Sequence, residues 1–223
     1  MRKRKRRLKL AKRLRIPKNH HEIYLKEQGY KNICGLDEVG RGSWAGPLVA
    51  AAVILDKRYY GLRDSKLLKP RDREKLARKI KRTCLFGIGE VSVEEIDQFR
   101  LTKATQLAFS RAVKNLKVKP DFILIDGTIP LLYPERAGAS RTGCRPLVKG
   151  DLTCLSIAAA SIIAKVHRDR LMRRLDKKVK GYYFRFHKGY GTKLHQRRLK
   201  KLGPSEIHRK YYLPIARLTK QAK

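Results

Sequence analysis

Short apolar runs separated by glycine and proline dominate the first half of the chain. Residues 33–36 and 48–55 are almost entirely apolar, and three glycines and a proline stand within residues 40–47 between them. Short apolar runs with such boundaries are typical of buried strands. The pattern therefore predicts a strand, a functional turn and a second strand, with further strands at 84–93, 122–125 and 146–148.

Apolar residues that recur every three or four positions predict the helices. Between 101 and 116 they form one stripe, as on a helix with one buried face. A proline suits the first turn of a helix at 70–82, and the alanine-rich segment 156–165 is a strong helix former. The mixture of strands and helices predicts an α/β fold with a mixed central sheet flanked by helices. Further helices at 20–30 and 193–201 give a helical C-terminal region, and 128–145 is expected to be a loop.

Charge changes this picture of an ordinary folded protein. The chain has 56 lysines and arginines against 19 acidic residues, a net charge of +37. A polyanionic partner is therefore expected, and nucleic acid fits better than a membrane surface. Charge alone does not separate an enzyme from a packaging or ribosomal protein. The cysteines show no paired spacing, which argues against structural zinc or a disulfide framework and favours a reducing, cytoplasmic setting; they are Cys34, Cys84, Cys144 and Cys154.

The scarce acids gather at the ends of apolar runs. Asp37 and Glu38 follow the run at 33–36, Asp126 follows 122–125, and Asp151 stands just before the alanine-rich helix. If the two strands are neighbours, these side chains converge at one edge of the sheet. Four oxygen donors without a histidine or cysteine pattern suit Mg²⁺ or Mn²⁺ rather than zinc. Two such ions, about 4 Å apart, can activate water and stabilise the leaving oxygen in phosphodiester hydrolysis.

Each acid also has a structural alternative. Asp151 is equally suited to cap a helix, and Asp126 precedes a glycine as in a common turn. The adjacent Asp37 and Glu38 lack such an explanation, because buried carboxylates are costly without a cation. Asp169, flanked by arginines, is expected to form a surface ion pair. A non-catalytic basic protein that binds nucleic acid remains the alternative from another class.

The segment 35–42, Gly-Leu-Asp-Glu-Val-Gly-Arg-Gly, together with Ala-Gly-Pro at 45–47 and the apolar run at 50–55, resembles the signature of ribonuclease HII, the type 2 ribonuclease H. Ordered matches to this family cover roughly residues 31–212. The other signatures are Asp-Ser-Lys at 64–66, Leu-Ile-Asp-Gly at 124–127, Lys-Gly-Asp at 149–151, residues 156–166, His-Lys-Gly-Tyr-Gly-Thr at 187–192, Gly-Pro-Ser at 203–205 and His-Arg at 208–209.

The resemblance implies a ribonuclease H-like fold and an endonuclease that hydrolyses the RNA strand of RNA/DNA hybrids. It also implies nicking on the 5′ side of single ribonucleotides in duplex DNA, which leaves 3′-hydroxyl and 5′-phosphate ends. We expect a basic extension at 1–30, a catalytic domain at 31–215, a basic tail at 216–223, and a monomer. By the resemblance, the catalytic and metal-binding residues are Asp37, which is expected to contact both Mg²⁺ or Mn²⁺ ions, with Glu38, Asp126 and Asp151.

Substrate-binding residues also follow from the resemblance. The turn Gly40-Arg41-Gly42 would sense the 2′-hydroxyl at the RNA-to-DNA junction, and Tyr190 would pack on the deoxyribose just past it. Ser65 and Lys66 would hold a phosphate.

The chain departs from the family pattern just after the turn. Ser43-Trp44 replaces the Pro-Leu usual after the turn, and we expect Trp44 to pack there. Ser161 is expected to serve packing, and Lys165 to pair or snorkel. The nearest enzymatic alternative is ribonuclease HIII, which normally has threonine in place of Arg41 and an added N-terminal domain.

Overall fold

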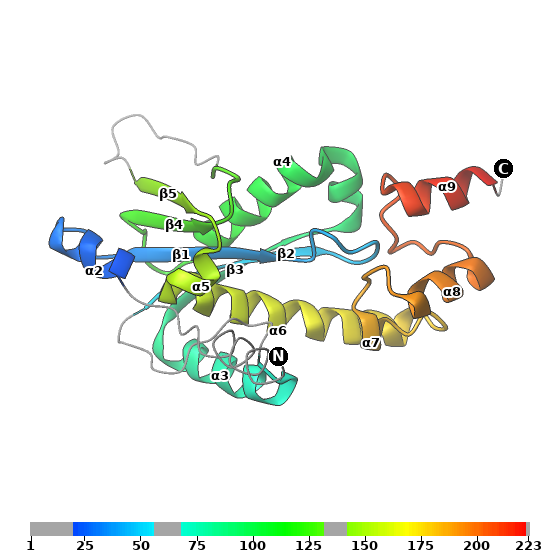
Figure 1. Cartoon of the computed structure of the whole chain (residues 1–223), viewed down its shortest axis with the longest axis horizontal. Helices are drawn as coiled ribbons and strands as arrows, with labels where there is room; N and C mark the ends of the chain where they lie inside the picture. The colour runs from blue at the N-terminus through cyan, green and yellow to red at the C-terminus, as the bar shows by residue number, and fades with distance from the viewer. Residues whose placement is uncertain (1–19, 56–67, 132–141, 222–223) are drawn as a thin grey trace, which may run out of the picture.

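A mixed five-stranded sheet lies at the centre of the molecule (Figure 1). The computed structural model describes residues 20–55, 68–131 and 142–221. The strands are β1 (Ile33–Val39), β2 (Leu48–Ile54), β3 (Leu85–Val91), β4 (Phe122–Asp126) and β5 (Gly143–Leu147), in the spatial order β3-β2-β1-β4-β5. β1, β2 and β3 pair antiparallel, whereas β1, β4 and β5 pair parallel. The predicted α/β fold with a mixed sheet is confirmed.

Two strand boundaries differ from the predictions. β1 does not end at Asp37 but continues to Val39, because Asp37 and Glu38 pair with Ala51 and Ala50 of β2. β5 begins at residue 143, inside the segment expected to be a loop. Its sequence is not apolar, and the middle of the strand is exposed. Pairing with β4, rather than a hydrophobic pattern, makes this segment a strand.

The helices are α2 (His20–Glu27), α3 (Pro70–Thr83), α4 (Val93–Lys114), α5 (Gly150–Thr153), α6 (Leu155–Lys178), α7 (Phe184–His187), α8 (Lys193–Leu202) and α9 (Leu213–Gln221). α4 begins well before the predicted residue 101, because Ser92 and Glu95 form a capping box. Arg100, at φ 64°, interrupts the helix, and the predicted apolar stripe starts just after this kink. α6 continues far beyond the alanine-rich segment.

Helices cover both faces of the sheet. α4 packs on one face, and α6 with α3 packs on the other, as Figure 1 shows above and below the strands. Even-numbered residues of 48–54 in β2 face α4, and odd-numbered residues of 49–53 face α3 and α6. A strand buried on both faces needs apolar residues throughout, which explains the unbroken run in the sequence.

The start of α6 is fixed beneath β1. Gly35 permits this, because a Cβ at that position would lie 2.1 Å from the carbonyl carbon of Ser156. From the other side, the buried Glu22 of α2 accepts hydrogen bonds from the backbone nitrogen of Ser156 at 2.8 Å and from its Oγ at 2.9 Å. α6 is therefore held at the point where it supports the acidic residues of β1.

The C-terminal helices α7, α8 and α9 gather beyond one end of the sheet, around the far part of α6 (Figure 1). They enclose a small core of their own, formed by Met172, Phe184, Leu199 and Ile215 with Ala45 and Tyr182. Within the described part of the chain, no helix has the length and apolar character that crossing a membrane would require.

Candidate active site

Asp37 and Asp126 lie side by side at the carboxyl ends of β1 and β4. The two strands are parallel neighbours, and Leu36 pairs with Ile125 in register. Side chains alternate along a strand, so Asp37 faces the same side as Gly35, which contacts α6. Asp126 shares its side with Leu124, which packs against the first turn of α6. The structure thus brings both acids together on the α6 face.

Asp151 reaches this place from α5. The backbone nitrogen of Gly150 donates to Oδ1 of Asp126 at 2.7 Å, which ties the start of α5 to β4. Asp151 itself is buried, with 5% of its surface exposed. The residue that caps α6 is Cys154, without a side-chain capping bond. The alternative that Asp151 is the N-cap of α6 is therefore wrong.

Glu38 lies on the opposite side of β1, next to the turn that follows the strand. Its Oε1 is 3.5 Å from Nη1 of Arg41, and the two side chains are 14% and 41% exposed. The backbone nitrogen of Glu38 donates to Oδ1 of Asp37 at 2.7 Å, which orients the neighbouring carboxylate. The pair Glu38–Arg41 links the acidic cluster to the glycine-rich turn.

The pKa values of Asp37 and Glu38 are both raised. Burial is the main reason that the pKa of Asp37 lies well above its usual value, and the charges of Glu38, Asp126 and Asp151 raise it further. A hydrogen bond with Ser161 of α6 acts in the opposite direction. The pKa of Glu38 is raised mainly by burial and then by Asp126, while Arg41 lowers it. A cation among these carboxylates would relieve their mutual repulsion.

The donor chemistry fits a hard divalent ion. Carboxylate oxygens are the ligands that Mg²⁺ and Mn²⁺ prefer. Among the described residues, however, no three histidine, cysteine, aspartate or glutamate side chains stand close enough to hold a metal ion as they are. The acids that fit the ion by their chemistry would have to draw together around it. One oxygen each of Asp37 and Asp126 already accepts a backbone hydrogen bond.

Two buried arginines, Arg168 and Arg209, hold the loop 40–47. The sequence indicated no role for either, although His-Arg at 208–209 is one of the family signatures. Arg209 donates to the carbonyl of Gly46 from Nε and Nη2, at 3.0 and 2.9 Å, and to the carbonyl of Arg41 from Nη1 at 3.0 Å. Arg168 of α6 contacts other atoms of the same loop. In the sequence, only the position of Arg168 in the helix indicates that it is buried, since it follows Ala160 and Ala164 at the four-residue spacing of the buried stripe.

The residues 187–192, called the Tyr190 loop below, lie against loop 40–47. The Tyr190 ring centre is 6.0 Å from Nζ of Lys165 and 5.6 Å from Cζ of Arg168. The backbone nitrogen of Trp44 donates to the carbonyl of Gly189 at 2.8 Å. A Cβ at Gly191 would lie 2.2 Å from the Trp44 indole. Trp44 thus packs at this junction, as predicted.

Three buried histidines support the Tyr190 loop. His187 accepts from the backbone nitrogen of Gly189 at Nδ1, and His208 accepts from that of Ser205. Nδ1 of His195 lies 3.0 Å from the carbonyl of Tyr190, so it donates, and Nε2 of His195 then accepts from Nε2 of His208 at 3.0 Å. These bonds require neutral rings. Burial accordingly lowers the pKa of His195 to about 4 and that of His208 to about 3.

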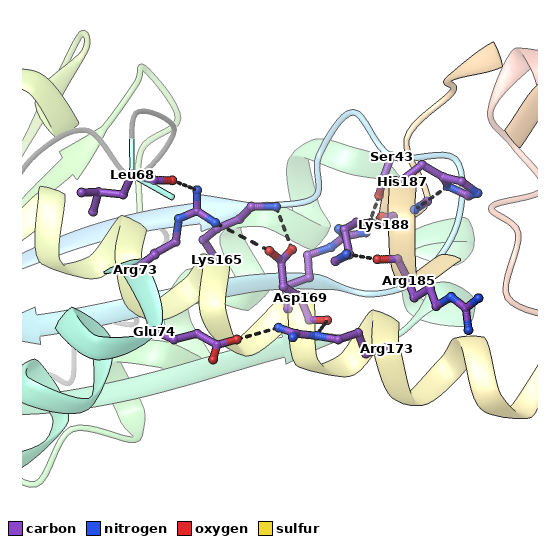
Figure 2. A network of polar contacts seen from close by, with 12 residues as sticks. Ser43, Leu68, Arg73, Glu74, Lys165, Asp169, Arg173, Arg185, His187 and Lys188 are labelled. Carbon is purple, nitrogen blue, oxygen red and sulfur yellow. Dashed lines mark hydrogen bonds and ion pairs between the residues drawn. The ribbon is translucent and has the colours of Figure 1, made fainter. Parts of the chain in front are cut away.

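Other predicted residues have mixed outcomes. Asp169 forms an ion pair with Lys165 at 2.7 Å, with Arg73 3.9 Å away, which confirms the predicted pair (Figure 2). The pair is largely buried, not on the surface, since the Asp169 side chain is only 13% exposed. Ser161 does more than pack, because it hydrogen-bonds Asp37. Ser65 and Lys66 lie outside the described residues.

Comparison with known proteins gives a consistent result. Residues 34–213 match the family model of ribonuclease HII. Ribonuclease HII of Thermus thermophilus is 45% identical over 190 residues, which cover 82% of this chain and 87% of that protein. Ribonuclease H2 of Pyrococcus horikoshii has a similar structure, with a TM-score of 0.69 and 28% identity, over 86% of this chain and 98% of that one.

A more distant structure shares the fold alone. Bst ribonuclease HIII, solved in complex with Mn²⁺, has a TM-score of 0.66 at 22% identity, over 86% of this chain and 70% of that one. The higher identity to ribonuclease HII and the match of the family model decide between the two types. The chain belongs to the ribonuclease HII family, whose members are metal-dependent endoribonucleases that cleave RNA in RNA/DNA hybrids.

Proposed function

We propose that this protein hydrolyses the RNA strand of RNA/DNA hybrids and also nicks duplex DNA on the 5′ side of a single embedded ribonucleotide. The products would carry 3′-hydroxyl and 5′-phosphate ends. The observation that carries the proposal is the convergence of the acids from β1, β4 and α5, whose charges raise the pKa of buried Asp37. Such a cluster is costly in a folded protein unless a cation binds to it.

Asp37, Glu38, Asp126 and Asp151 are the residues that would hold Mg²⁺ or Mn²⁺, with two ions in the catalytic state. When bound, these ions supply the activation of water and the stabilisation of the leaving oxygen in phosphodiester hydrolysis. The chain prepares the carboxylates for this task. The amide of Glu38 orients Asp37, and the amide of Gly150 orients Asp126. Two of the four proposed ligands are thereby held in place by backbone amides.

The glycine-rich turn and the Tyr190 loop would read the sugars of the substrate. A Cβ at Gly42 would meet nothing within 4 Å, and Gly42 is exposed, so a sugar can approach the backbone there. The 2′-hydroxyl, which both donates and accepts hydrogen bonds, is the group that distinguishes RNA from DNA. Gly40 and Arg41 complete this turn. Tyr190, partly exposed over Lys165, would pack on the deoxyribose beyond the junction.

The proposal includes a monomer that acts in the cytoplasm on nucleic acid. The net charge of +37 favours phosphate binding, whose affinity falls as salt is raised. All four cysteines are unpaired in the structure, which supports a reducing compartment. Phosphate binding by Ser65 and Lys66 stays a prediction.

The test is the variant Asp126→Asn, assayed on a DNA duplex that contains one ribonucleotide, with and without Mg²⁺. We expect the wild type to nick on the 5′ side of the ribonucleotide only with the ion. Asp126→Asn should show no nick, while its affinity for the duplex is retained or increased, because a negative charge facing phosphate is removed. Glu74→Gln, a matched change on α3 where Glu74 pairs with Arg173, should leave cleavage unchanged.

The outcomes separate the alternatives. Binding without any nick by the wild type would favour a non-catalytic basic protein. Cleavage of long hybrids without a nick at single ribonucleotides would favour a ribonuclease HIII type of activity. Residual cleavage by Asp126→Asn together with lost binding would contradict the assignment of Asp126.

A further inference from the structure

We infer that Arg168 is a positioning residue that holds the Gly40–Gly42 turn and the Tyr190 loop in one fixed arrangement, and thereby sets the selectivity for a ribonucleotide followed by a deoxyribonucleotide. The inference rests on the proposed function, in which these two elements read the two sides of the junction. It goes beyond that function because Arg168 contacts neither sugar and acts through both readers.

The Arg168 side chain is completely buried and reaches oxygens of both loops. Its Nε donates to the carbonyl of Pro47 at 2.9 Å, and Nη2 donates to Oγ of Ser43 at 2.7 Å and to the carbonyl of Ala45 at 3.1 Å. Its Nη1 donates to the carbonyl of Lys188, within the Tyr190 loop, at 2.9 Å. One rigid, planar group therefore joins two loops that are far apart in the sequence.

Arg168 also touches the reading elements themselves. Gly40 has φ 97°, and a Cβ there would lie 2.2 Å from Nε of Arg168, so the turn rests directly on the guanidinium. The Ser43 hydroxyl, which accepts from Arg168, donates to the carbonyl of Gly40 at 2.9 Å. On the other side, Cζ of Arg168 is 5.6 Å from the centre of the Tyr190 ring. Ser43 and Lys188 lie close together in Figure 2, at the far end of the polar network along α6.

Shape rather than charge makes this connection specific. Burial lowers the pKa of Arg168 to about 10, and the guanidinium still carries its charge at neutral pH. Lysine would keep a positive charge in the same place. Its ammonium group is a point donor, however, and lacks the planar fork that reaches acceptors in two directions. Arg168→Lys therefore separates positioning from electrostatics.

The chain carries a reporter for this arrangement that does not depend on activity. Trp44 is the only tryptophan in the sequence. Its backbone nitrogen bonds to Gly189, and its indole lies against Gly191. A change in the placement of the two loops should alter the access of acrylamide to the indole, and with it the quenching of fluorescence.

The experiment compares Arg168→Lys with Arg170→Lys, an exposed arginine on the same helix close to Glu74 of α3. kcat/KM is measured on a duplex with one ribonucleotide and on a uniform RNA/DNA hybrid. The RNA strand of a uniform hybrid offers no deoxyribose to Tyr190. Its cleavage should therefore depend less on the relative placement of the Gly40–Gly42 turn and the Tyr190 loop. We expect Arg168→Lys to lower the ratio of the two kcat/KM values by about tenfold or more, since small misplacements cost large factors in rate. Trp44 quenching should increase, and Arg170→Lys should change neither quantity.

Ser43→Ala serves as a second variant in case Arg168→Lys does not fold. It removes the hydroxyl relay to Gly40, while Arg168 keeps its bonds to Pro47, Ala45 and Lys188. The selectivity ratio should fall by roughly threefold, as for one lost hydrogen bond. An equal fall of both kcat/KM values with unchanged Trp44 quenching would overturn the inference. A wild type that cleaves neither substrate would refute the proposed function instead, and Trp44 quenching in Arg168→Lys would still decide whether Arg168 holds the loops.

Discussion

Replacing Gly35 by alanine tests how closely α6 is seated beneath the acidic strand. A Cβ at position 35 would lie 2.1 Å from the carbonyl carbon of Ser156, 2.2 Å from the nitrogen of Ile157 and 2.5 Å from the carbonyl oxygen of Ser156. All three atoms belong to the helix backbone, so no side-chain rotation can relieve the overlap. Either the helix must retreat or β1 must bend.

The size of the effect follows from these distances. Carbon atoms in contact normally lie about 3.5 Å apart or more, so the helix would have to move by roughly 1.4 Å. That movement would strain the bonds of Ser156 to Glu22 and the contact of Ser161 with Asp37. Overpacking of a core costs about 1–3 kcal/mol, and we expect the upper end here because only backbone is met. For a protein of this length, a loss of about 3 kcal/mol lowers Tm by about 6–12 °C.

Thermal and urea unfolding of Gly35→Ala and Gly42→Ala measure this cost. Gly42 is the matched control, since a Cβ there would meet nothing within 4 Å and its backbone is not in the left-handed region. The free energy of unfolding of Gly42→Ala should stay within about 0.5 kcal/mol of the wild-type value, as for most surface substitutions. A Gly35→Ala protein as stable as Gly42→Ala would refute the close seating of α6.

Two other predictions concern stability. In the folded protein the pKa values of His195 and His208 are about 4 and 3, below the unfolded value of about 6.5. Their contribution to the free energy of unfolding should be complete above pH 6.5. It should fall by roughly 1 kcal/mol for each histidine by pH 5.5, because the unfolded chain then takes up protons. Urea unfolding at pH 7.5 and 5.5 checks this, and the difference should shrink in His208→Gln; an equal difference in both proteins would contradict it. Glu22→Ala removes the buried carboxylate that accepts hydrogen bonds from the start of α6, and should lower the free energy of unfolding by about 1–2 kcal/mol. Glu27→Ala, at an exposed position of α2, should not lower it. Equal losses in the two variants would count against a capping role of Glu22.

The sequence predicted best those parts of the fold that depend on local pattern. The unbroken apolar run at 48–55 indicated a buried strand, and the structure covers β2 with α4 on one face and with α3 and α6 on the other. The positions of Asp37 and Asp126 at the ends of apolar runs indicated convergence if the two strands are neighbours, and the structure pairs β1 with β4 in parallel. Membership in the ribonuclease HII family was also evident from the order of the motifs.

The sequence could not show features that arise only from tertiary contacts. β5 is exposed and irregular in composition, and its strand exists because β4 offers a pairing edge. Arg168 and Arg209 are two of 56 basic residues, and neither the helical spacing of Arg168 nor the signature at 208–209 shows which backbone carbonyls each one binds. The neutral state of His195 depends on its burial and on bonds to Tyr190 and His208, which only the fold of the C-terminal helices brings into place.

The uninterrupted course of α6 has a consequence for where a strand is cut. Ser161 meets the acidic end of β1, and Arg168, seven residues later and about 10 Å along the axis, meets loop 40–47 and the Tyr190 loop. Under the proposed function, the rise of this single helix would set the distance between the sugar that is recognised and the bond that is cut. Inserting one residue between positions 161 and 168 would rotate Arg168 by about 100° around the helix axis relative to Ser161. The insertion should therefore relocate or abolish the nick instead of merely slowing it.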